Sequence, residues 1–313
     1  MKLSLLVLIA AQDDALARLA DAYELIYAPD AATREQAIAT HGADVQLVLT
    51  NGTTGLSEAD LARLPKLGFL HALGVGYENL PVAAARARGI ALAHGVGAND
   101  DCVADHAFAL LLAAVRGVVR LDAACRAGVW RDALPMEPNF SGKRLGIVGL
   151  GRIGEKVARR AAGFDLEVGY HNRRPREGAA ALRYFDALTD LASWADYLLV
   201  ATPGGAQTRH LIDAAILDAL GPRGFLVNVS RGSTVDTAAL AAALREGRLA
   251  GAGLDVYESE PAPPAELIDL DTVVLTPHVA GTSPEARDRT IDLFLDNAAR
   301  HFAGQPLLTP LDA

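Results

Sequence analysis

The residues GIVGLGRIG at positions 146–154 constrain the fold of this chain more than any other feature. An apolar run, Leu145–Val148, leads into the glycines, and a charged segment suited to a helix follows them. A strand, a glycine turn and a helix start in this order are typical of a dinucleotide-binding fingerprint. We expect Gly149 to permit the tight turn, Gly151 to let the backbone approach a pyrophosphate, and Gly154 to let the helix pack closely on the strand.

The start of that helix should offer free N–H groups and a partial positive charge to phosphates. A glycine-rich turn in an unrelated α/β protein is the alternative interpretation. Under the dinucleotide interpretation, the cofactor contacts in this loop are Gly149, Leu150, Gly151, Arg152, Ile153 and Gly154.

The loop after the next apolar run, Leu166–Tyr170, indicates which dinucleotide binds. In NAD sites an Asp or Glu ~20 residues after the fingerprint bonds the ribose 2′-hydroxyl. Here the chain reads Asn172-Arg173-Arg174 instead. Because a guanidinium donates to a phosphate that a carboxylate would repel, we expect NADP(H) to be preferred, with these three residues around the 2′-phosphate. NAD(H) stays possible as a cofactor, and a solvated basic loop is the alternative.

Composition limits the classes of protein to consider. With 313 residues, 51% of them hydrophobic, the chain is long enough for two domains with large cores. A net charge of −9 does not suit nucleic acid or an anionic membrane. No apolar run reaches the ~18 residues of a membrane span. Cys102 and Cys125 lack metal-ligand spacing and fall in one predicted helix, so we expect reduced thiols, no metal and a cytoplasmic protein.

The amino terminus has two interpretations. The apolar run Leu3–Ala11 resembles a short signal peptide. The following segment carries charges together with Leu16, Leu19 and Ala20 at helical spacing, which favours a buried first strand followed by a helix.

Alternating apolar and amphipathic segments predict an α/β fold with parallel sheets. The predicted strands are Leu3–Ile9, Val45–Leu49, Phe69–Leu73 and Ile90–Ala93, then Arg144–Val148, Glu167–Tyr170, Tyr197–Ala201, Phe225–Val229, Gly251–Leu254 and Val273–Leu275. One long helix, Cys102–Trp130, should cross between domains, and a helix at Pro284–Phe302 should return to the first. We expect two Rossmann-like domains: a discontinuous, flavodoxin-like substrate domain (1–98 and 285–313) and a doubly wound dinucleotide-binding domain (99–284).

Three loops that follow predicted strands, at 228–232, 254–261 and 275–281, hold the polar groups that chemistry needs. Since ligands bind beyond the carboxyl ends of strands in open α/β sheets, these loops should converge on one crevice. An arginine there can bind a carboxylate and polarise a carbonyl. A histidine can pass a proton near neutral pH, and a nearby carboxylate stabilises its charged form. The set suits reduction of a 2-keto acid with hydride from a nicotinamide.

On these residues the chain resembles the D-isomer-specific 2-hydroxyacid dehydrogenases over essentially its whole length. The matching stretches are GIVGLGRIG, NVSRGSTVD, GLDVYESEP and LTPHVAG. The resemblance implies three catalytic residues: Arg231 to bind the keto acid, His278 as acid/base, and Glu260 as the partner of His278. It also implies that backbone N–H groups of Val75 and Gly76 bind the substrate carboxylate.

The resemblance implies further cofactor contacts as well. Asp255 resembles the family residue near the nicotinamide carboxamide, and Thr202, Pro203 and Thr208 resemble the wall beside the adenosine. The predicted cofactor contacts also include Val229, Ser230, Arg231, His278 and Gly281. By contrast, we expect Glu258 to be a solvated neighbour of Glu260, and His106 and His210 to be structural.

The arginines after Tyr170 make the chain resemble the NADPH-dependent glyoxylate/hydroxypyruvate reductase branch of this family. The expected partner is a small 2-keto or 2-hydroxy acid. Phenylpyruvate and 2-ketogluconate are alternative substrates, and a nucleotide-sensing module like the related corepressors is an alternative of a different class. The segment Cys102–Trp130 is an expected dimer surface, which implies a homodimer.

Overall fold

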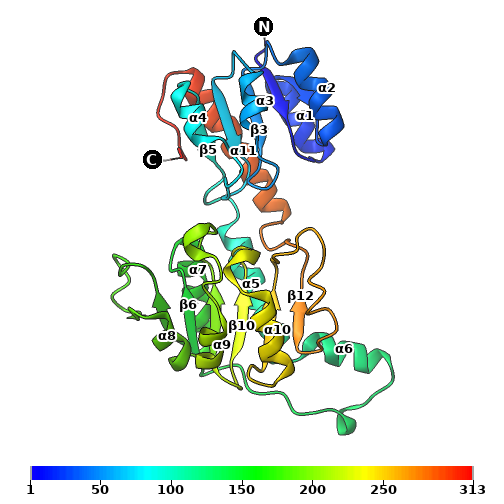
Figure 1. Cartoon of the computed structure of the whole chain (residues 1–313), viewed down its shortest axis with the longest axis vertical. Helices are drawn as coiled ribbons and strands as arrows, with labels where there is room; N and C mark the ends of the chain where they lie inside the picture. The colour runs from blue at the N-terminus through cyan, green and yellow to red at the C-terminus, as the bar shows by residue number, and fades with distance from the viewer. Residues whose placement is uncertain (1, 312–313) are drawn as a thin grey trace. The chain divides into compact units, whose positions relative to one another are not determined.

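The computed structural model describes residues 2–311, which divide into two compact units (Figure 1). Unit 1 holds the residues up to Asn99 and from Thr282 onward, and unit 2 holds Asp100–Gly281. The sequence placed these borders at 98/99 and 284/285. Met1 and residues 312–313, which we expected in the first domain, lie outside the described residues.

Unit 1 contains a parallel sheet whose described strands are β1 (Ser4–Val7), β2 (Glu24–Tyr27), β3 (Leu47–Thr50), β4 (Phe69–Ala72) and β5 (Ala91–His94). The strand order β2-β1-β3-β4-β5 is the flavodoxin-like order, which confirms the expectation. The central strands β3 and β4 are buried throughout, as parallel strands covered on both faces should be. The sequence analysis missed β2, an edge strand with exposed Glu24 and Tyr27.

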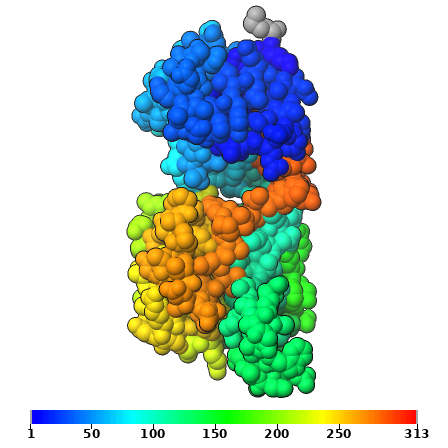
Figure 2. All heavy atoms as spheres, turned by 90° about the vertical axis from the view of Figure 1, so that its right-hand side faces the viewer, coloured from blue at the N-terminus to red at the C-terminus, as the bar shows by residue number. Residues whose placement is uncertain are grey.

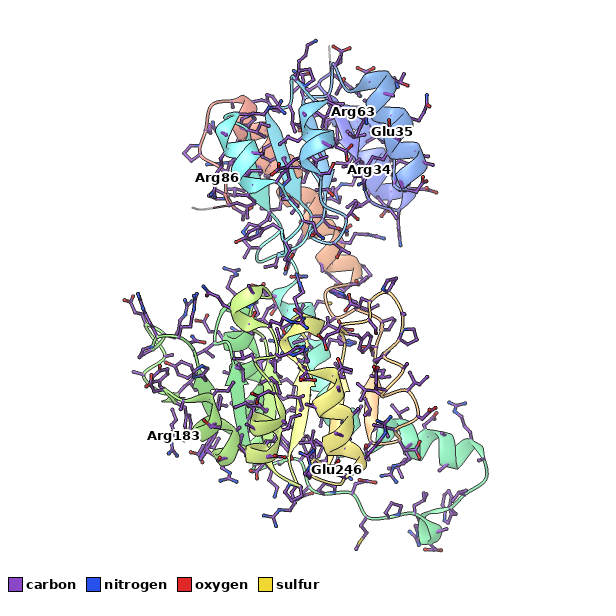
Figure 3. All side chains as sticks on the ribbon, viewed as in Figure 1. Arg34, Glu35, Arg63, Arg86, Arg183 and Glu246 are labelled. Carbon is purple, nitrogen blue, oxygen red and sulfur yellow. The ribbon has the colours of Figure 1, made fainter. Side chains whose placement is uncertain are left out.

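Helices cover both faces of this sheet. One face packs against α2 (Ala31–His41), α3 (Glu58–Ala62) and α4 (Val82–Ala87), and the other against α1 (Asp13–Ala22) and α11 (Pro284–Phe302). The helix α11 has the predicted bounds, with Ser283 as its N-cap and Pro284 in its first turn. On the first face, the Arg63 guanidinium donates to both Glu35 carboxylate oxygens and so ties α3 to α2 (Figure 3).

Unit 2 contains a second parallel sheet, with strands β6 (Arg144–Val148), β7 (Glu167–His171), β8 (Arg183–Tyr184), β9 (Tyr197–Val200), β10 (Phe225–Asn228), β11 (Gly251–Leu254) and β12 (Val273–Leu275). Their order is β12-β11-β10-β9-β6-β7-β8, so the direction of winding reverses between β6 and β9. This is the doubly wound order expected for a dinucleotide-binding domain. Only the two-residue strand β8 was not predicted among those described here.

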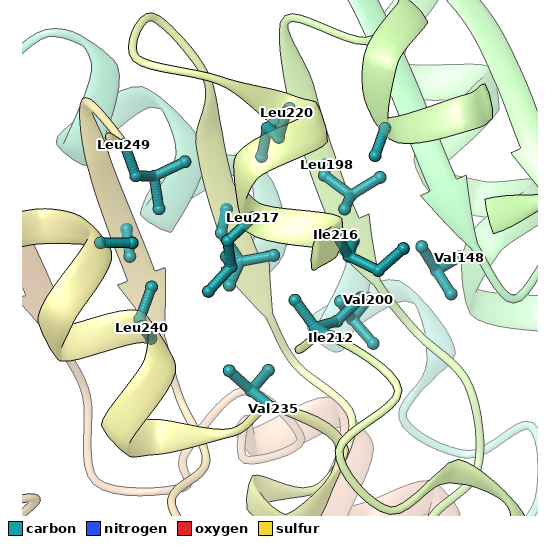
Figure 4. Packing of buried hydrophobic residues seen from close by; sticks show 14 of the residues in the cluster. Val148, Leu198, Val200, Ile212, Ile216, Leu217, Leu220, Val235, Leu240 and Leu249 are labelled. Atoms are coloured by element: carbon teal, nitrogen blue, oxygen red, sulfur yellow. The ribbon is translucent and has the colours of Figure 1, made fainter. Parts of the chain in front are cut away.

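The two faces of the second sheet are also covered. The helices α8 (Leu188–Trp194), α9 (Ala214–Leu220) and α10 (Thr237–Arg245) pack on one face, where Leu198, Leu217 and Leu240 belong to the same buried cluster (Figure 4). The helices α5 (Asp100–Val115) and α7 (Arg152–Ala161) cover the other. Short 3-10 turns at η1 (Arg131–Ala133), η2 (Ala162–Phe164), η3 (Ala206–Thr208) and η4 (Gly232–Thr234) complete the unit.

The expectation of a single helix over Cys102–Trp130 is wrong. The helix α5 ends at Val115, and α6 (Val118–Arg126) continues at 60° to it. The break has a local cause, because Gly117 takes a left-handed conformation with φ 57°. Cys102 and Cys125 therefore lie in different helices.

Within the described residues, no single helix is long and apolar enough to cross a membrane. The helices α5 and α6, which are bent relative to each other, reach the required length and apolar composition only when they are taken together.

His71 is a polar side chain inside the core of unit 1. It lies on β4 with no exposed surface, its ring contacts Phe69 and Phe294, and both ring nitrogens lack a hydrogen-bond partner among the described atoms. Burial lowers the pKa of His71 from 6.5 to about 3. The unfolded chain therefore takes up a proton at a pH where the folded chain does not, and stability is lost as the pH falls below 6.5.

We predict that His71→Leu removes this loss. Between pH 7 and pH 5.5 the wild-type chain should lose about 1 kcal/mol more unfolding free energy than the variant, since one proton is taken up only on unfolding. Urea unfolding at the two pH values measures the difference. His41→Leu, at the exposed end of α2, is the control and should keep the wild-type pH dependence. Equal pH dependence in wild type and His71→Leu would contradict the assignment.

Candidate functional site

The predicted site residues of unit 2 follow its strands at the carboxyl edge of the sheet. Gly149 follows β6, Asn172 follows β7, Thr202 and Pro203 follow β9, Val229–Arg231 follow β10, Asp255 follows β11, and His278–Gly281 follow β12. All these strands are parallel, so their loops gather at one edge. The reversal of strand order lies between β6 and β9, which is where open α/β sheets bind ligands.

The glycine loop fits a dinucleotide. Gly149 has φ 99°, and a Cβ there would lie 2.8 Å from the Thr202 backbone nitrogen. A Cβ on Gly154 would lie 2.5 Å from the Gly149 oxygen, so the helix approaches the strand as closely as predicted. Gly151 has open space where a Cβ would stand, and it is the N-cap of α7. The three glycines therefore leave a cradle of backbone at a helix N-terminus, which suits a pyrophosphate.

Asn172 supports this loop from the end of β7. Its Oδ1 accepts from the Leu150 N–H at 2.7 Å, and its Nδ2 donates to the Leu150 oxygen at 3.3 Å. Its side-chain amide therefore pairs with both backbone groups of Leu150, as another backbone segment would, and holds the glycine loop in place. The sequence predicts Asn172 as a contact of the 2′-phosphate, and the bonds to Leu150 are a role that this prediction does not include.

The two arginines after Asn172 are exposed. Arg173 donates from Nη1 to Gln207 Oε1 at 3.0 Å, so the loop after β7 lies beside η3. In η3, the Thr208 hydroxyl donates to the Pro203 oxygen at 2.9 Å. The basic loop and the predicted adenosine wall are therefore neighbours.

A buried hydrogen-bond network shapes the turn that carries Arg231. Asn228, the last residue of β10, accepts from the N–H and hydroxyl of Ser230 and donates to the Arg231 oxygen at 3.1 Å. The Thr234 hydroxyl donates to the same oxygen at 2.7 Å. Asn228 and Thr234 have no exposed surface. The sequence analysis includes Asn228 and Thr234 in the stretch NVSRGSTVD but gives neither a role, although an asparagine that ends an apolar strand is a signal that could have indicated one for Asn228.

The stem of Arg231 lies against the glycines after β9. A Cβ on Gly204 would lie 2.6 Å from Arg231 Cγ, and Gly205 has φ 129°. Only glycine lets the chain pass so close to the arginine and turn there. The Arg231 guanidinium itself donates from Nη1 to the Ser230 oxygen at 2.8 Å.

His278 and Glu260 form the predicted pair. The His278 Nδ1 lies 2.8 Å from Glu260 Oε2, while Glu260 Oε1 accepts from the Tyr257 N–H at 2.9 Å. The two side chains are 41% and 30% exposed, so a small molecule in solvent can reach them. Because a carboxylate holds Nδ1, the pair leaves Nε2 as the nitrogen for proton exchange.

Asp255 holds the backbone around His278. Its carboxylate is buried and accepts from the N–H groups of Val279 and Ala280, both at 2.9 Å, and from the Thr276 hydroxyl. The His278 N–H in turn donates to the Asp255 backbone oxygen at 2.8 Å, and His278 has φ 53°. This strained backbone is thus fixed by several bonds at once.

His106 reaches the same cluster from α5. Its Nε2 lies 2.9 Å from Thr276 Oγ1 and 3.5 Å from Asp255 Oδ1. The side chain thus closes the network around Asp255, which agrees with the structural role expected of it.

Glu258 is exposed, as expected of a solvated neighbour of Glu260, but it is also extensively hydrogen-bonded. Its carboxylate accepts from the His210 ring, from the N–H and hydroxyl of Thr237, and from Arg209.

Among the described residues, no group of three or more His, Cys, Asp or Glu side chains has the arrangement of a metal site.

Val75 and Gly76 belong to unit 1, in the loop after β4. His94 Nδ1 lies 2.9 Å from the Val75 oxygen. A Cβ on Gly52 would lie 2.6 Å from the Gly76 oxygen, and one on Gly95 would lie 2.1 Å from the Leu73 oxygen. The loop is therefore held on both sides by backbone that only glycine permits.

Comparisons with known proteins agree with this geometry. Residues 108–280 match the model of the D-isomer specific 2-hydroxyacid dehydrogenase, NAD binding domain. The chain is 38% identical to glyoxylate/hydroxypyruvate reductase A of Arabidopsis thaliana, over 87% of each protein. It is 39% identical to hydroxyphenylpyruvate reductase of Plectranthus scutellarioides, over 88% of each.

A solved relative covers almost the whole fold. The NADPH-dependent glyoxylate/hydroxypyruvate reductase of Sinorhizobium meliloti, in complex with NADP and malonate, superposes with a TM-score of 0.90 at 37% identity, covering 99% of this chain and 97% of that one. This similarity extends over most of the chain, so it includes both parallel sheets, the glycine cradle and the segments that carry Glu260 and His278. The chain belongs to the D-isomer-specific 2-hydroxyacid dehydrogenase family and is an oxidoreductase.

Proposed function

We propose that this protein uses NADPH to reduce a short 2-keto acid, such as glyoxylate or hydroxypyruvate, to the D-2-hydroxy acid. The observation that carries the proposal is the set of Arg231, Glu260 and His278 on loops after β10, β11 and β12, which are neighbours in one sheet. The names of the Arabidopsis and Sinorhizobium relatives support this class of substrate. Unit 2 is the proposed coenzyme domain, and unit 1 carries the proposed substrate loop.

Each residue has a separate role in the proposal. When bound, the nicotinamide coenzyme supplies the hydride. Arg231 pairs with the substrate carboxylate and polarises the keto oxygen, and the N–H groups of Val75 and Gly76 add donors to the carboxylate. His278 gives a proton from Nε2 to the developing alkoxide, since its Nδ1 is held by Glu260 at 2.8 Å. The Glu260 carboxylate stabilises the charged imidazole before the transfer.

Initial rates test this function. Purified protein should oxidise NADPH rapidly with glyoxylate or hydroxypyruvate. His278→Ala should lower kcat by about 100-fold or more, because general acid catalysis contributes this much, while NADPH binding stays within about 2-fold of wild type. The control His41→Ala, on an exposed helix end, should retain full turnover. Full turnover by His278→Ala would reject its role.

A second substrate class has support of its own. Hydroxyphenylpyruvate reductase of Plectranthus scutellarioides matches this chain as well as the Arabidopsis enzyme does, with 39% identity. Phenylpyruvates therefore belong in the same assay, together with 2-ketogluconate. Higher kcat/KM with one of these would change the proposed substrate and keep the proposed catalytic residues.

The preference for NADPH rests on Arg173 and Arg174 in our proposal, with Asn172 beside them. Both guanidiniums are exposed after β7, where a 2′-phosphate would extend from the ribose. The NADP bound to the Sinorhizobium relative supports the assignment.

We predict that the double variant Arg173→Ala, Arg174→Ala binds NADPH about 10-fold or more weakly than the wild type and binds NADH within about 2-fold of the wild type. The reason is that charge-assisted hydrogen bonds to the phosphate, which NADH lacks, contribute roughly 1.5 kcal/mol or more. Fluorescence titration with each coenzyme measures both constants. Arg183→Ala, on the edge strand β8, is the control with unchanged binding (Figure 3). Equal losses for the two coenzymes would contradict the assignment.

We also propose that the protein is a homodimer. The segment 118–136, which runs from α6 to just beyond η1, projects from unit 2 (Figure 2), and no residue of α6 is buried. Apolar side chains cover this projection: Val118, Val119, Trp130 and Met136 are 51%, 56%, 69% and 99% exposed. An exposed apolar segment of this kind suits an interface between subunits.

Sedimentation velocity tests the dimer. The wild-type protein should sediment as a dimer, and Trp130→Ser combined with Met136→Ser should raise the dimer dissociation constant by about 10-fold or more, since each buried large apolar side chain contributes roughly 1.5–3 kcal/mol. Ile268→Ser, at another exposed apolar position in unit 2, is the matched control. A monomeric wild type at micromolar concentration would reject the proposal.

A further inference from the structure

Glu258 joins three segments of unit 2. Its Oε1 accepts from His210 Nε2 at 2.8 Å and faces Arg209 Nη1 at 3.4 Å. Its Oε2 accepts from the Thr237 hydroxyl at 2.8 Å and from the Thr237 N–H at 3.2 Å. The segments are the loop before α9, the start of α10 and the loop after β11. A single carboxylate therefore bridges elements that are far apart in sequence.

Two of these segments, the loop before α9 and the loop after β11, lie beside Arg231 and the η4 turn that follows it. The His210 N–H donates to the Ser233 oxygen at 2.8 Å, so the loop before α9 pairs with η4, directly after the arginine. Gly232 abuts the loop after β11, since a Cβ there would lie 1.9 Å from the Tyr257 carbonyl carbon. The Arg231 stem meets Gly204, which precedes His210 in the same loop. The stem of Arg231 and the turn directly after it thus contact segments that Glu258 ties together.

The backbone of His210 shows how firmly this junction is held. His210 has φ 49°, a left-handed conformation that is costly for a residue other than glycine. The acid/base His278 has the same unusual feature, at φ 53°, and each histidine pairs at 2.8 Å with a glutamate from the one loop after β11. Burial opposes the ionisation of Glu258, but hydrogen bonds from His210 and Thr237 outweigh it and keep the pKa of Glu258 below its usual value.

We propose that His210 and Glu258 are positioning residues, which brace the turn and the stem of Arg231 so that its guanidinium meets the substrate carboxylate. The inference rests on the proposed function, because it assigns Arg231 the substrate. Neither residue need touch the reacting atoms. We call the His210–Glu258 pair the brace. Without it, the Arg231 side chain is mobile in the free enzyme. Substrate binding must then immobilise this side chain, which lowers the affinity.

Steady-state kinetics with the keto acid that the wild type reduces test the brace. Glu258→Ala and His210→Ala should each raise KM for the keto acid by about 10-fold, with kcat reduced less and the NADPH dissociation constant within about 2-fold, because the lost interaction is with substrate. His210→Gln should recover most of the affinity, since its amide can donate to Glu258 as the ring does. The double variant should be no worse than Glu258→Ala, because the bond between the two side chains is already lost in that single variant.

Glu246→Ala is the matched control. Glu246 is an exposed carboxylate at the other end of α10 and pairs with Arg248 (Figure 3). Its loss should leave both kinetic constants unchanged. Wild-type KM in Glu258→Ala or His210→Ala would overturn the inference, and so would additive effects in the double variant.

Hydrogen exchange separates this inference from the proposed function. Peptides covering residues 229–240 should exchange faster in Glu258→Ala than in wild type or in Glu246→Ala, whether or not a substrate is known. A wild type that reduces none of the keto acids would overturn the proposed function and the substrate role of the brace with it. If the wild type is active but Glu258→Ala shows wild-type hydrogen exchange and wild-type KM, the positioning role of His210 and Glu258 is overturned while the proposed function stands.

Discussion

The parallel direction of the strands is the constraint on which the rest of this structure depends. Parallel neighbours cannot be joined by tight hairpins, so each connection crosses a face of the sheet and covers it. In unit 2 this brings the loops after β6, β9, β10, β11 and β12 to one edge. Gly149, Arg231 and His278 meet there although more than 120 residues separate the first from the last. A fold with hairpins would have scattered the same motifs.

Three carboxylates that follow β11 hold the loops at this edge of the sheet in one arrangement. Asp255, Glu258 and Glu260 lie within six residues of one another after β11, and each binds a different part of the surroundings. Asp255 fixes the backbone on either side of His278, Glu260 holds its ring, and Glu258 ties the neighbouring segments. Buried or half-buried charges of this kind are costly unless hydrogen bonds satisfy them, so the three carboxylates also specify a single arrangement of the loops.

Much of the fold could be predicted from periodicity and turn signals. The strand at Arg144–Val148 and the helix at Pro284–Phe302 have the predicted bounds, because a glycine turn ends the first and a capping serine followed by proline starts the second. The break between α5 and α6 was missed because one glycine in an apolar stretch is compatible with a continuous helix. The edge strands β2 and β8 are short and partly exposed, so the apolar signal that marks a strand is weak there.

The sequence by itself determined which chemical groups are present and which strand each follows, since glycine spacing and apolar runs are local properties. It therefore pointed to the glycine cradle and the family, and the resemblance to that family implied the pairing of His278 with Glu260. Only the tertiary structure decided what the side chains between these motifs do. Asn172 bonds the fingerprint, Asn228 shapes the arginine turn, and Glu258 pairs with His210 across 48 positions. Such partners are chosen by packing in three dimensions, and hydrogen-bonding groups that satisfy one another across a fold leave no periodic trace in the chain.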